Sequence, residues 1–559
     1  RAAGPSRVRV FAAAALRSAF ASLQTGTVLG RRPTPRSTPV TTHQQPAAVA
    51  TDKRAQRNIL IAVLTALIAV IASVSGLNVA QQDLARSLGA TQGAVLWIIN
   101  AYTLALAALL MPIGAIGDRF GRKPLLLGGL ALFGIANTVA AFSTVPLMMI
   151  VARVLAGSGA AMIMPVTLSV ITSSFPAEDR GRAIGIWSGF AGSGGMIGLF
   201  VSAFMVDVLS WRWTFVLPIA LAVVGFVFTL RFVPNSTEGH THRFDTVGSV
   251  LSALAIGGLV LGIQEGPERG WSSTVAVVGL AIGVASLIGF VLVEFRAESP
   301  LFDLRTFADR SLATGSLTLL IIFGAMFGSL LVLFPFFQAV LGWSALGSAA
   351  GILPMAAMMM PMSTVAPRIA GRFGTRATMA AGAGIFTAGL VALALGASVE
   401  GGYFSVLPGL LLFGLGLGLS MTPATTVITE SLPADKQGVA SALNDTTREL
   451  GGAIGVALLG SVFSAGFRSS MTPALKDLPR ELSEPASEGI GKAFGVAANA
   501  GDAAPRIIDA AKHALVDGWV RSMWAGAAFG IAAFLFVVVR GPRSAPVADP
   551  AELAVESAS

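Results

Sequence analysis

The chain has 559 residues, of which 54% are hydrophobic and 12% are charged, whereas an ordinary soluble domain carries about 25% charged residues. This composition excludes a soluble protein. The formal net charge of +9 indicates membrane topology in such a chain, and no nucleic-acid partner is expected. Cysteine is absent, which excludes disulfides, thiolate nucleophiles and cysteine-ligated metals.

Polar tails are expected at both ends of the chain. Residues 1–57 are rich in Arg, Ser, Thr, Pro and Ala and hold no apolar run long enough to span a membrane, so they are expected to be disordered. Residues 541–559 are expected to form a second disordered tail, in the cytoplasm. Because the first methionine is Met111, inside an apolar run, the natural start of translation is expected to differ from Arg1.

Between the tails, apolar runs of about 20 residues follow one another with short polar gaps. They predict an all-α integral membrane protein with fourteen spans, near residues 58–79, 94–113, 124–142, 146–170, 183–206, 213–232, 246–264, 274–293, 312–334, 345–366, 376–397, 403–425, 439–465 and 519–540. All four histidines lie outside these runs. We therefore expect no metal site, no histidine base in the membrane and no enzymatic activity.

Positive charge orients the predicted helices. On one side the short loops hold only Arg86, Arg212 and Arg269, whereas nineteen cations lie in the alternate loops and the tails on the opposite side. The long segment 466–518 is left out of this comparison, because long loops cross the membrane regardless of charge. Both termini are therefore expected in the cytoplasm, which requires an even number of spans. Residues 466–518 are expected to form one long external loop with a surface helix near 505–517.

An internal repeat indicates two halves. GAIGDRFGRK at 114–123 follows the second predicted span, and PRIAGRFGTR at 367–376 follows the tenth. The repeat predicts a six-helix bundle at 58–232 and another at 312–540. The linker between them, residues 233–311, would contain the two remaining helices.

The first copy of the repeat gathers charge in one short turn. Asp118 lies near the start of the next helix, whose dipole stabilises a carboxylate, and glycines permit the tight turn. The cations Arg119, Arg122 and Lys123 surround it. On charge alone, this loop could equally be a simple anchor on the cytoplasmic side.

Two predicted spans contain charged residues. Arg153 in the fourth span is a candidate functional residue, because a bare arginine in lipid is costly, unless its side chain extends to the helix end. In the thirteenth span, Asp445 and Glu449 are four residues apart and share a helical face, and Arg448 lies beside them. This arrangement predicts a coupled pair that handles a proton; the alternative is a solvated helix start among lipid headgroups.

These motifs resemble those of the major facilitator superfamily, in particular its fourteen-helix drug:proton antiporter branch. The resemblance covers about residues 58–540 and rests on the 114–123 loop, RVLAGSGAA at 153–161, WRW at 211–213, PLFDLRTF at 300–307 and ALNDTTRELGGAIGVALLGS at 442–461. It implies two six-helix bundles plus two inserted helices, enclosing a central cavity that opens alternately to each side of the membrane.

The resemblance also implies roles for individual residues. The 114–123 loop would act as a conformational latch between the bundles, through Gly114, Asp118, Arg119, Gly121, Arg122 and Lys123. Proton coupling would involve Arg153, Asp445, Arg448 and Glu449. The substrate cavity would include Asn78, Asn100, Gly157, Gly194, Gly198, Gln338 and Asn444.

The sequence departs from the family pattern at several positions. Gly371 stands where the second copy of the loop would have an acid, and Ser73 stands where the first helix would have one. Gly185, Gly194 and Gly198 match the spacing of the antiporter motif in the fifth helix, but Leu199 replaces its proline. Helix packing alone is a second explanation for these glycines.

The resemblance predicts proton-driven efflux of hydrophobic or amphipathic drugs across a bacterial inner membrane, and hence antibiotic resistance. Expected partners are small substrates, protons and membrane lipids; no cofactor is expected beyond the proton gradient, and the protein is expected to be a monomer. The alternatives are a dedicated exporter of one metabolite or lipid, a symporter, and a membrane sensor that does not transport. An intramembrane hydrolase is disfavoured because no histidine lies in a span.

Overall fold

The structure is a computed structural model that describes residues 52–236 and 244–542. Within these ranges all regular elements are helical, as a lipid environment favours, because a helix satisfies its own backbone hydrogen bonds. Of the two expected tails, only residues 52–57 and 541–542 lie within the described part of the chain.

Two of the helices before the linker begin with a capping side chain. Asp52 accepts a hydrogen bond from the Arg54 amide at the start of the first helix, and Thr91 accepts one from the Ala94 amide. The elements are α2 (Lys53–Val79), α3 (Gln81–Leu88), α4 (Gln92–Phe120), α5 (Arg122–Ala141), α6 (Pro146–Ser174), α7 (Ala177–Val208), η1 (Trp211–Phe215) and α8 (Val216–Phe232).

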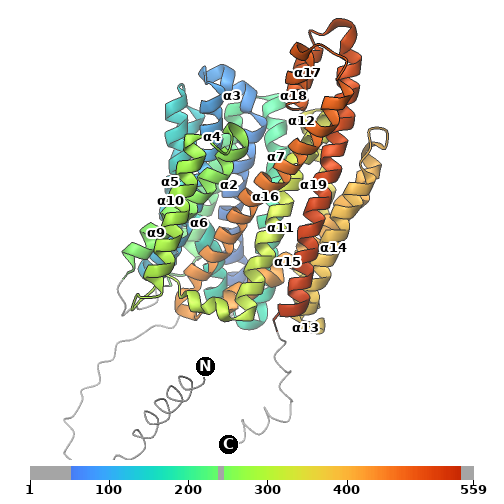
Figure 1. The fold of residues 1–559 in the computed structure, drawn as a ribbon. Coiled ribbons are helices and arrows are strands. Elements are labelled where there is room, and N and C mark those ends of the chain that lie inside the picture. The colour runs from blue at the N-terminus through green and yellow to red at the C-terminus, as the bar shows by residue number, and fades with distance from the viewer. Residues whose placement is uncertain (1–51, 237–243, 543–559) are drawn as a thin grey trace, which may run out of the picture. The chain divides into compact units, whose positions relative to one another are not determined.

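The next two helices form a hairpin, α9 (Thr246–Arg269) and α10 (Thr274–Glu294), followed by the short η2 (Leu304–Ala308). Small residues let the two helices approach closely: a side chain at Gly258 would collide with the backbone of Gly279 and Gly283. The hairpin lies beside α4 and α16, as Figure 1 shows.

The remaining elements follow the linker. They are α11 (Arg310–Pro335), η3 (Phe336–Val340), α12 (Ala345–Gly351), α13 (Leu353–Phe373), α14 (Thr375–Gly396), α15 (Gly402–Glu430), η4 (Ala434–Lys436), α16 (Gln437–Ala474), α17 (Arg480–Ala486), α18 (Ile490–Ala497), η5 (Gly501–Ala503) and α19 (Ala504–Arg540).

Fourteen of these helical stretches are long and apolar enough to cross a membrane, which confirms the predicted number and the all-α membrane fold. Two of the helices, α16 and α19, extend well beyond their predicted spans. Helix α16 continues to Ala474, and α19 begins at Ala504, so the segment expected as a separate surface helix at 505–517 is the first part of α19. Buried Met471 and Ile507 belong to the apolar faces that hold these extensions in place.

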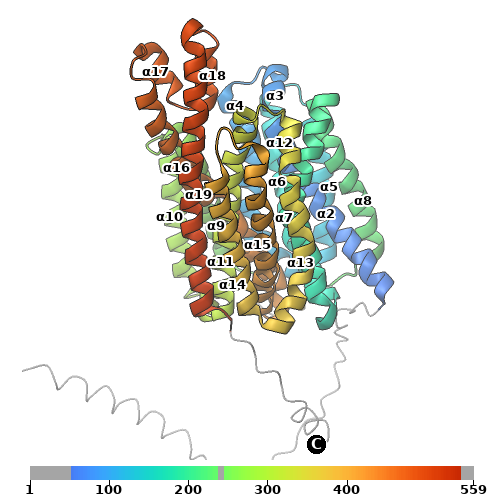
Figure 2. The same ribbon diagram turned by 90° about the vertical axis from the view of Figure 1, so that its right-hand side faces the viewer.

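Figures 1 and 2 show where the helices begin and end. Helix α2 begins and α19 ends at one end of the bundle, and α17 and α18 project at the opposite end. Because α2 leaves the first of these ends and α4 returns to it, the α4–α5 turn with Asp118 lies there; we call it the Asp118 end. The first six spans pack mainly on one another, as do the last six, and the two sets meet where α4 and α6 contact α16 and where α7 contacts α13.

The two copies of the repeat have the same backbone geometry. Gly121 (φ 104°) and Gly374 (φ 87°) each end one span, and the next span starts at the following residue. Both glycines have positive φ, where a side chain would be strained. The cation two residues further on holds the last helix of its own half: Lys123 donates to the Leu230 carbonyl of α8, and Arg376 donates to the Val538 carbonyl of α19.

Candidate functional site

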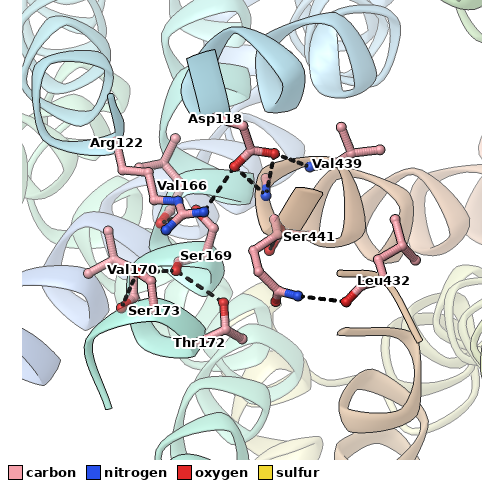
Figure 3. Close-up of polar contacts among 12 residues, drawn as sticks. Asp118, Arg122, Val166, Ser169, Val170, Thr172, Ser173, Leu432, Val439 and Ser441 are labelled. Carbon is pink, nitrogen blue, oxygen red and sulfur yellow. Dashed lines mark hydrogen bonds and ion pairs between the residues drawn. The ribbon is translucent and has the colours of Figure 1, made fainter. Parts of the chain in front are cut away.

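At the Asp118 end, a carboxylate of the first half caps a helix of the second half. Both carboxylate oxygens of Asp118 lie 2.8 Å from the backbone nitrogen of Gly438, and Oδ2 lies 3.1 Å from that of Val439. Figure 3 shows these contacts. The amides belong to the first turn of α16, where no acceptor exists within the helix, and the negative charge faces the positive end of the helix dipole. Asp118 therefore joins the halves through a charge-assisted contact.

The neighbouring loop residues divide into two groups. Arg122 is buried, and its Nη2 lies 3.1 Å from Asp118 Oδ1, while a Cβ at Gly114 would lie 2.6 Å from the Gly438 carbonyl oxygen. In contrast, Arg119 is exposed and stacks on the neighbouring Phe120 ring. Gly114 and Asp118 thus meet α16 and Arg122 pairs with Asp118, whereas the contacts of Arg119 and Lys123 lie elsewhere.

The second copy of the loop has no equivalent contact. Gly371 stands where Asp118 stands in the first copy, and a Cβ placed on it would find no atom within 4 Å. The capping contact is therefore confined to one of the two copies, although their backbones match.

Helices α7 and α13 close the same end of the molecule. A Cβ at Gly185 would lie 2.6 Å from the carbonyl oxygen of Ser363, and one at Gly192 would lie 2.7 Å from Met359 Cε. Gly194, in contrast, faces Ile71 of its own half. Gly198 is buried. The glycines at 185 and 192 thus allow the two halves to approach closely.

We expect Gly185→Val to open the Asp118 end, because the valine side chain would overlap the α13 backbone. Overpacking of this kind costs about 1–3 kcal/mol and would destabilise the contact between α7 and α13. The measurement is labelling of a cysteine at Ser363, which is fully buried, by a water-soluble maleimide in this cysteine-free chain. Labelling should be about tenfold faster or more than in Ser363→Cys alone. Gly225→Val, at a contact between helices of one half, is the control and should leave the rate unchanged; equal rates in both would contradict the closing role.

Arg153 on α6 is fully buried and held by neutral groups. Its Nη1 donates to Ser73 Oγ at 3.0 Å and to the Ser73 carbonyl at 3.4 Å, and Nε donates to the Ile98 carbonyl at 3.4 Å. Ser73 Oγ in turn donates to Asn137 Oδ1 at 2.9 Å. The guanidinium carbon lies 4.2 Å from the centre of the Tyr102 ring, a cation–π distance.

The expected cavity residues do not all come together. A side chain at Gly157 would overlap the Tyr102 carbonyl, so this glycine serves close packing of α4 and α6. Asn100 is partly exposed on α4, where its carbonyl accepts a hydrogen bond from Thr103 Oγ1. Gln338 is exposed in η3, after the end of α11. The side chain of Asn78 lies outside the described part of the chain.

Helix α16 carries the expected carboxylates. Asp445 is fully buried, and its Oδ1 accepts a hydrogen bond of 3.0 Å from Nδ2 of the equally buried Asn444. Glu449, one turn further on, is partly exposed. The two carboxylates and Arg448 lie within electrostatic reach of one another, so a proton bound to one affects the other.

Arg448 lies between aromatic rings of the two halves. Its guanidinium carbon is 4.8 Å from the ring centre of Trp187 on α7 and 5.0 Å from that of Phe323 on α11, and Nη2 donates to Thr425 Oγ1 at 3.2 Å. Trp187 is fixed by a 3.0 Å hydrogen bond from Nε1 to Thr167 Oγ1. The arginine expected in the coupling group thus also bridges the halves.

Three aromatic residues of this site escaped the sequence prediction: Tyr102, Trp187 and Phe323. A signal existed for the first, because the chain has only two tyrosines and a tyrosine in a span needs a partner for its hydroxyl; here the hydroxyl donates to the Val70 carbonyl at 3.2 Å. Trp187 and Phe323 lie in apolar runs, where nothing distinguishes them from packing residues.

Within the described ranges, no group of three or more His, Cys, Asp or Glu side chains is placed to hold a metal ion.

Comparison with known proteins identifies related transporters. Residues 61–456 match the sequence profile of the Major Facilitator Superfamily. The chain is 32% identical over 424 residues to the multidrug resistance protein Stp of Mycobacterium tuberculosis, covering 76% of this chain and 79% of Stp. It is 32% identical over 429 residues to the multidrug efflux pump LfrA of Mycolicibacterium smegmatis, covering 76% and 84%, and 33% identical over 355 residues to the quinolone resistance protein NorB of Staphylococcus aureus, covering 63% and 76%.

Solved structures share the fold at low sequence identity. The proton:xylose symporter XylE superposes with a TM-score of 0.55 at 14% identity, covering 87% of this chain and 96% of XylE. The human organic anion transporter MFSD10 superposes with a TM-score of 0.55 at 12% identity, covering 87% of this chain and all of that structure.

Proposed function

This chain belongs to the major facilitator superfamily, and we propose that it exports hydrophobic or amphipathic compounds, antibiotics among them, in exchange for protons. It is a multi-pass bacterial membrane protein related to multidrug efflux pumps. The observation that carries the proposal is the charged group on α16, in which Asp445 and Arg448 are buried and Glu449 is partly exposed; this helix contacts the first half of the molecule. Charged groups within a membrane span are characteristic of proton and substrate pathways.

Alternating access supplies the mechanism. The structure has the Asp118 end closed, by the Asp118–α16 contact and by the α7–α13 interface. Opening this end requires Asp118 to release the Gly438 amide and Arg448 to leave the Trp187 ring, because each of these contacts joins the two halves. A proton on Asp445 or Glu449 changes the charge beside Arg448 and so biases the choice between the two states.

The proposed orientation places both termini and the Asp118 end in the cytoplasm. Cysteines at Gly239 and Ile490, introduced one at a time into this cysteine-free chain, should be labelled by an impermeant maleimide from the cytoplasm and from outside, respectively. Intact and permeabilised cells distinguish the two sides. Reversed labelling of both would overturn the orientation, and labelling from one side would contradict the number of spans.

Transport in proteoliposomes tests the proposed function. Purified protein should move several chemically unrelated amphipathic dyes when a proton gradient is imposed, and an uncoupler should stop the movement. Movement of one compound from a diverse panel would instead indicate a dedicated exporter. Accumulation of substrate on the same side as the incoming protons would indicate a symporter, and no movement of any compound would overturn the proposal.

A further inference from the structure

The inserted hairpin of α9 and α10 holds two carboxylates close together where it reaches the Asp118 end (Figure 1). Asp245 directly precedes α9, and Glu294 is the last residue of α10. A Cβ placed on Gly248 would lie within 2.5 Å of both Asp245 Oδ2 and Glu294 Oε1, so these two oxygens lie at most twice that distance apart. A like charge this near disfavours the ionised form of a carboxylate.

Glu294 also has an oxygen without a hydrogen-bond partner. Its side chain is buried, and Oε2 accepts a hydrogen bond of 3.3 Å from the Phe302 amide. Among the described residues, no donor lies within hydrogen-bonding distance of the equally buried Oε1, which is unfavourable. A proton on Oε1 would make it a donor toward Asp245 Oδ2. One shared proton therefore removes both the repulsion and the missing hydrogen bond.

Little other charge acts on this pair. Within the described part of the chain, the other charged group that acts on Glu294 is Lys436 of η4, whose Nζ donates to the Pro300 carbonyl at 3.2 Å. On the neighbouring helix α4, Asp118 binds α16 and Arg119 stacks on Phe120. The charged side chains of the segment that follows α10 are exposed or cap η2: Arg296, Glu298, Asp303 and Arg305.

The carboxylate pair fastens the segment after α10 to the start of α16. Asp245 Oδ2 accepts a hydrogen bond of 3.3 Å from the Leu301 amide, next to the Phe302 amide that Glu294 holds. Lys436, the residue before α16, holds the adjoining Pro300 carbonyl. Asp118 binds the amides of α16 that begin two residues further on, at Gly438. The hairpin and the closing contact thus meet at the start of one helix.

We propose that Asp245 and Glu294 bind one shared proton from the solvent at the Asp118 end, and that this proton stabilises the closed state. The inference goes beyond the proposed function, because the site is separate from the coupling group on α16 and involves no substrate. Alkaline solution removes the proton, so the two ionised carboxylates repel each other and loosen the segment that they hold against α16. Acid restores the proton and the closed end. In an exporter driven by proton entry, this site would slow the cycle when the cytoplasm becomes acidic.

Infrared spectroscopy of the purified full-length protein tests the shared proton. At about pH 7 an isolated carboxylate is ionised, whereas the shared proton should give the carbonyl absorption of a carboxylic acid. Glu294→Gln should reduce this absorption. Glu298→Gln, at an exposed position of the segment after α10, is the control and should leave it unchanged. Equal acid absorption in wild type and Glu294→Gln would overturn the shared proton.

Labelling of Ser363→Cys by a water-soluble maleimide tests the effect on the closed end. Rates are compared at each pH with and without Glu294→Gln, so the pH effects on the thiol and on Asp445 and Glu449 are common to both proteins. Glutamine imitates the protonated side chain, because its amide donates toward Asp245. The rates should be equal at about pH 5, and at about pH 9 the protein with Glu294 should be labelled at least about tenfold faster. The same ratio at both pH values would overturn control of the closed end.

Asp245→Asn tests the pair from its other member and replaces Glu294→Gln if that variant does not fold. Asparagine still caps α9 and leaves a single carboxylate, so the labelling rate relative to Ser363→Cys alone should fall at about pH 9 as it does with Glu294→Gln. The control Glu298→Gln should match Ser363→Cys alone at both pH values. Unchanged rates with Asp245→Asn would overturn the pair. Because neither measurement uses a gradient or a substrate, both decide the inference even if no export is found in proteoliposomes.

Discussion

Asp118→Asn is expected to leave expression and membrane insertion intact while slowing transport at least about tenfold, equivalent to about 1.4 kcal/mol in barrier height. The carboxylate accepts hydrogen bonds from two amides in the first turn of α16. An asparagine keeps the size but loses the charge that faces the helix dipole, and it turns one acceptor into a donor. The state with the closed Asp118 end is thereby destabilised, and the cycle between the two states slows.

Initial rates of gradient-driven transport, at equal protein content per liposome, measure this effect. Asp179→Asn is the control: Asp179 lies at the same end and is bound by Lys53 and Gln56 of its own half, so its loss should change the rate less than about twofold. A normal rate in Asp118→Asn would leave the loop with a role in topology alone.

Much of the fold was accessible from the sequence because membrane helices have a strong hydropathy signal. Apolar runs located the fourteen spans, and the repeated RFG in the two loops corresponds to the same positive-φ turn at Gly121 and Gly374. The extent of α16 and α19 was less accessible. Their extensions beyond the spans are stabilised by packing on each other, as where Gly466 meets Gly518, and such contacts between distant segments have no local signature.

The candidate site was predicted as a set of charged residues and not as a set of contacts. Asp118 was expected to interact with the dipole of the next helix, α5, but it caps α16, whose Gly438 is 320 residues away in sequence. Arg153 was expected to take part in proton coupling, but its contacts with Ser73 and Tyr102 could not be predicted. Periodicity indicates which face of a helix is buried, and it does not indicate which buried side chain meets which.

Helix α16 connects the two functional regions. Asp118 caps it at Gly438 and Val439, and Asp445 follows Gly438 by seven residues, about 10 Å along the helix axis. A helix transmits displacement along its axis, because its backbone hydrogen bonds keep it stiff. A change of charge at Asp445 or Glu449 and a change of contact at Asp118 are therefore coupled through one element, which is the kind of physical link that a proton-driven conformational switch requires.

Glu449→Gln is expected to abolish gradient-driven efflux while the protein still binds substrate, because the variant removes the proton acceptor but keeps the size of the side chain and its apolar surroundings. Asp445→Asn is expected to weaken coupling or narrow the substrate range, since the two carboxylates form one coupled pair. Asp445 accepts a hydrogen bond from Asn444 and is fully buried, whereas Glu449 is partly exposed. That exposure makes Glu449 the better site for a proton that must come and go.

Substrate-induced proton release from detergent-solubilised protein tests this assignment directly, by comparison of wild type with the double variant Asp445→Asn/Glu449→Gln. The wild type should release protons when substrate is added, and the double variant should release none. Glu484→Gln, in the exposed part of α17, is the control and should release as many protons as wild type. Equal release from wild type and the double variant would place the proton site elsewhere.

Buried Glu265 is a poor alternative as the proton site, because Arg269 Nε lies 2.8 Å from its carboxylate and already neutralises its charge.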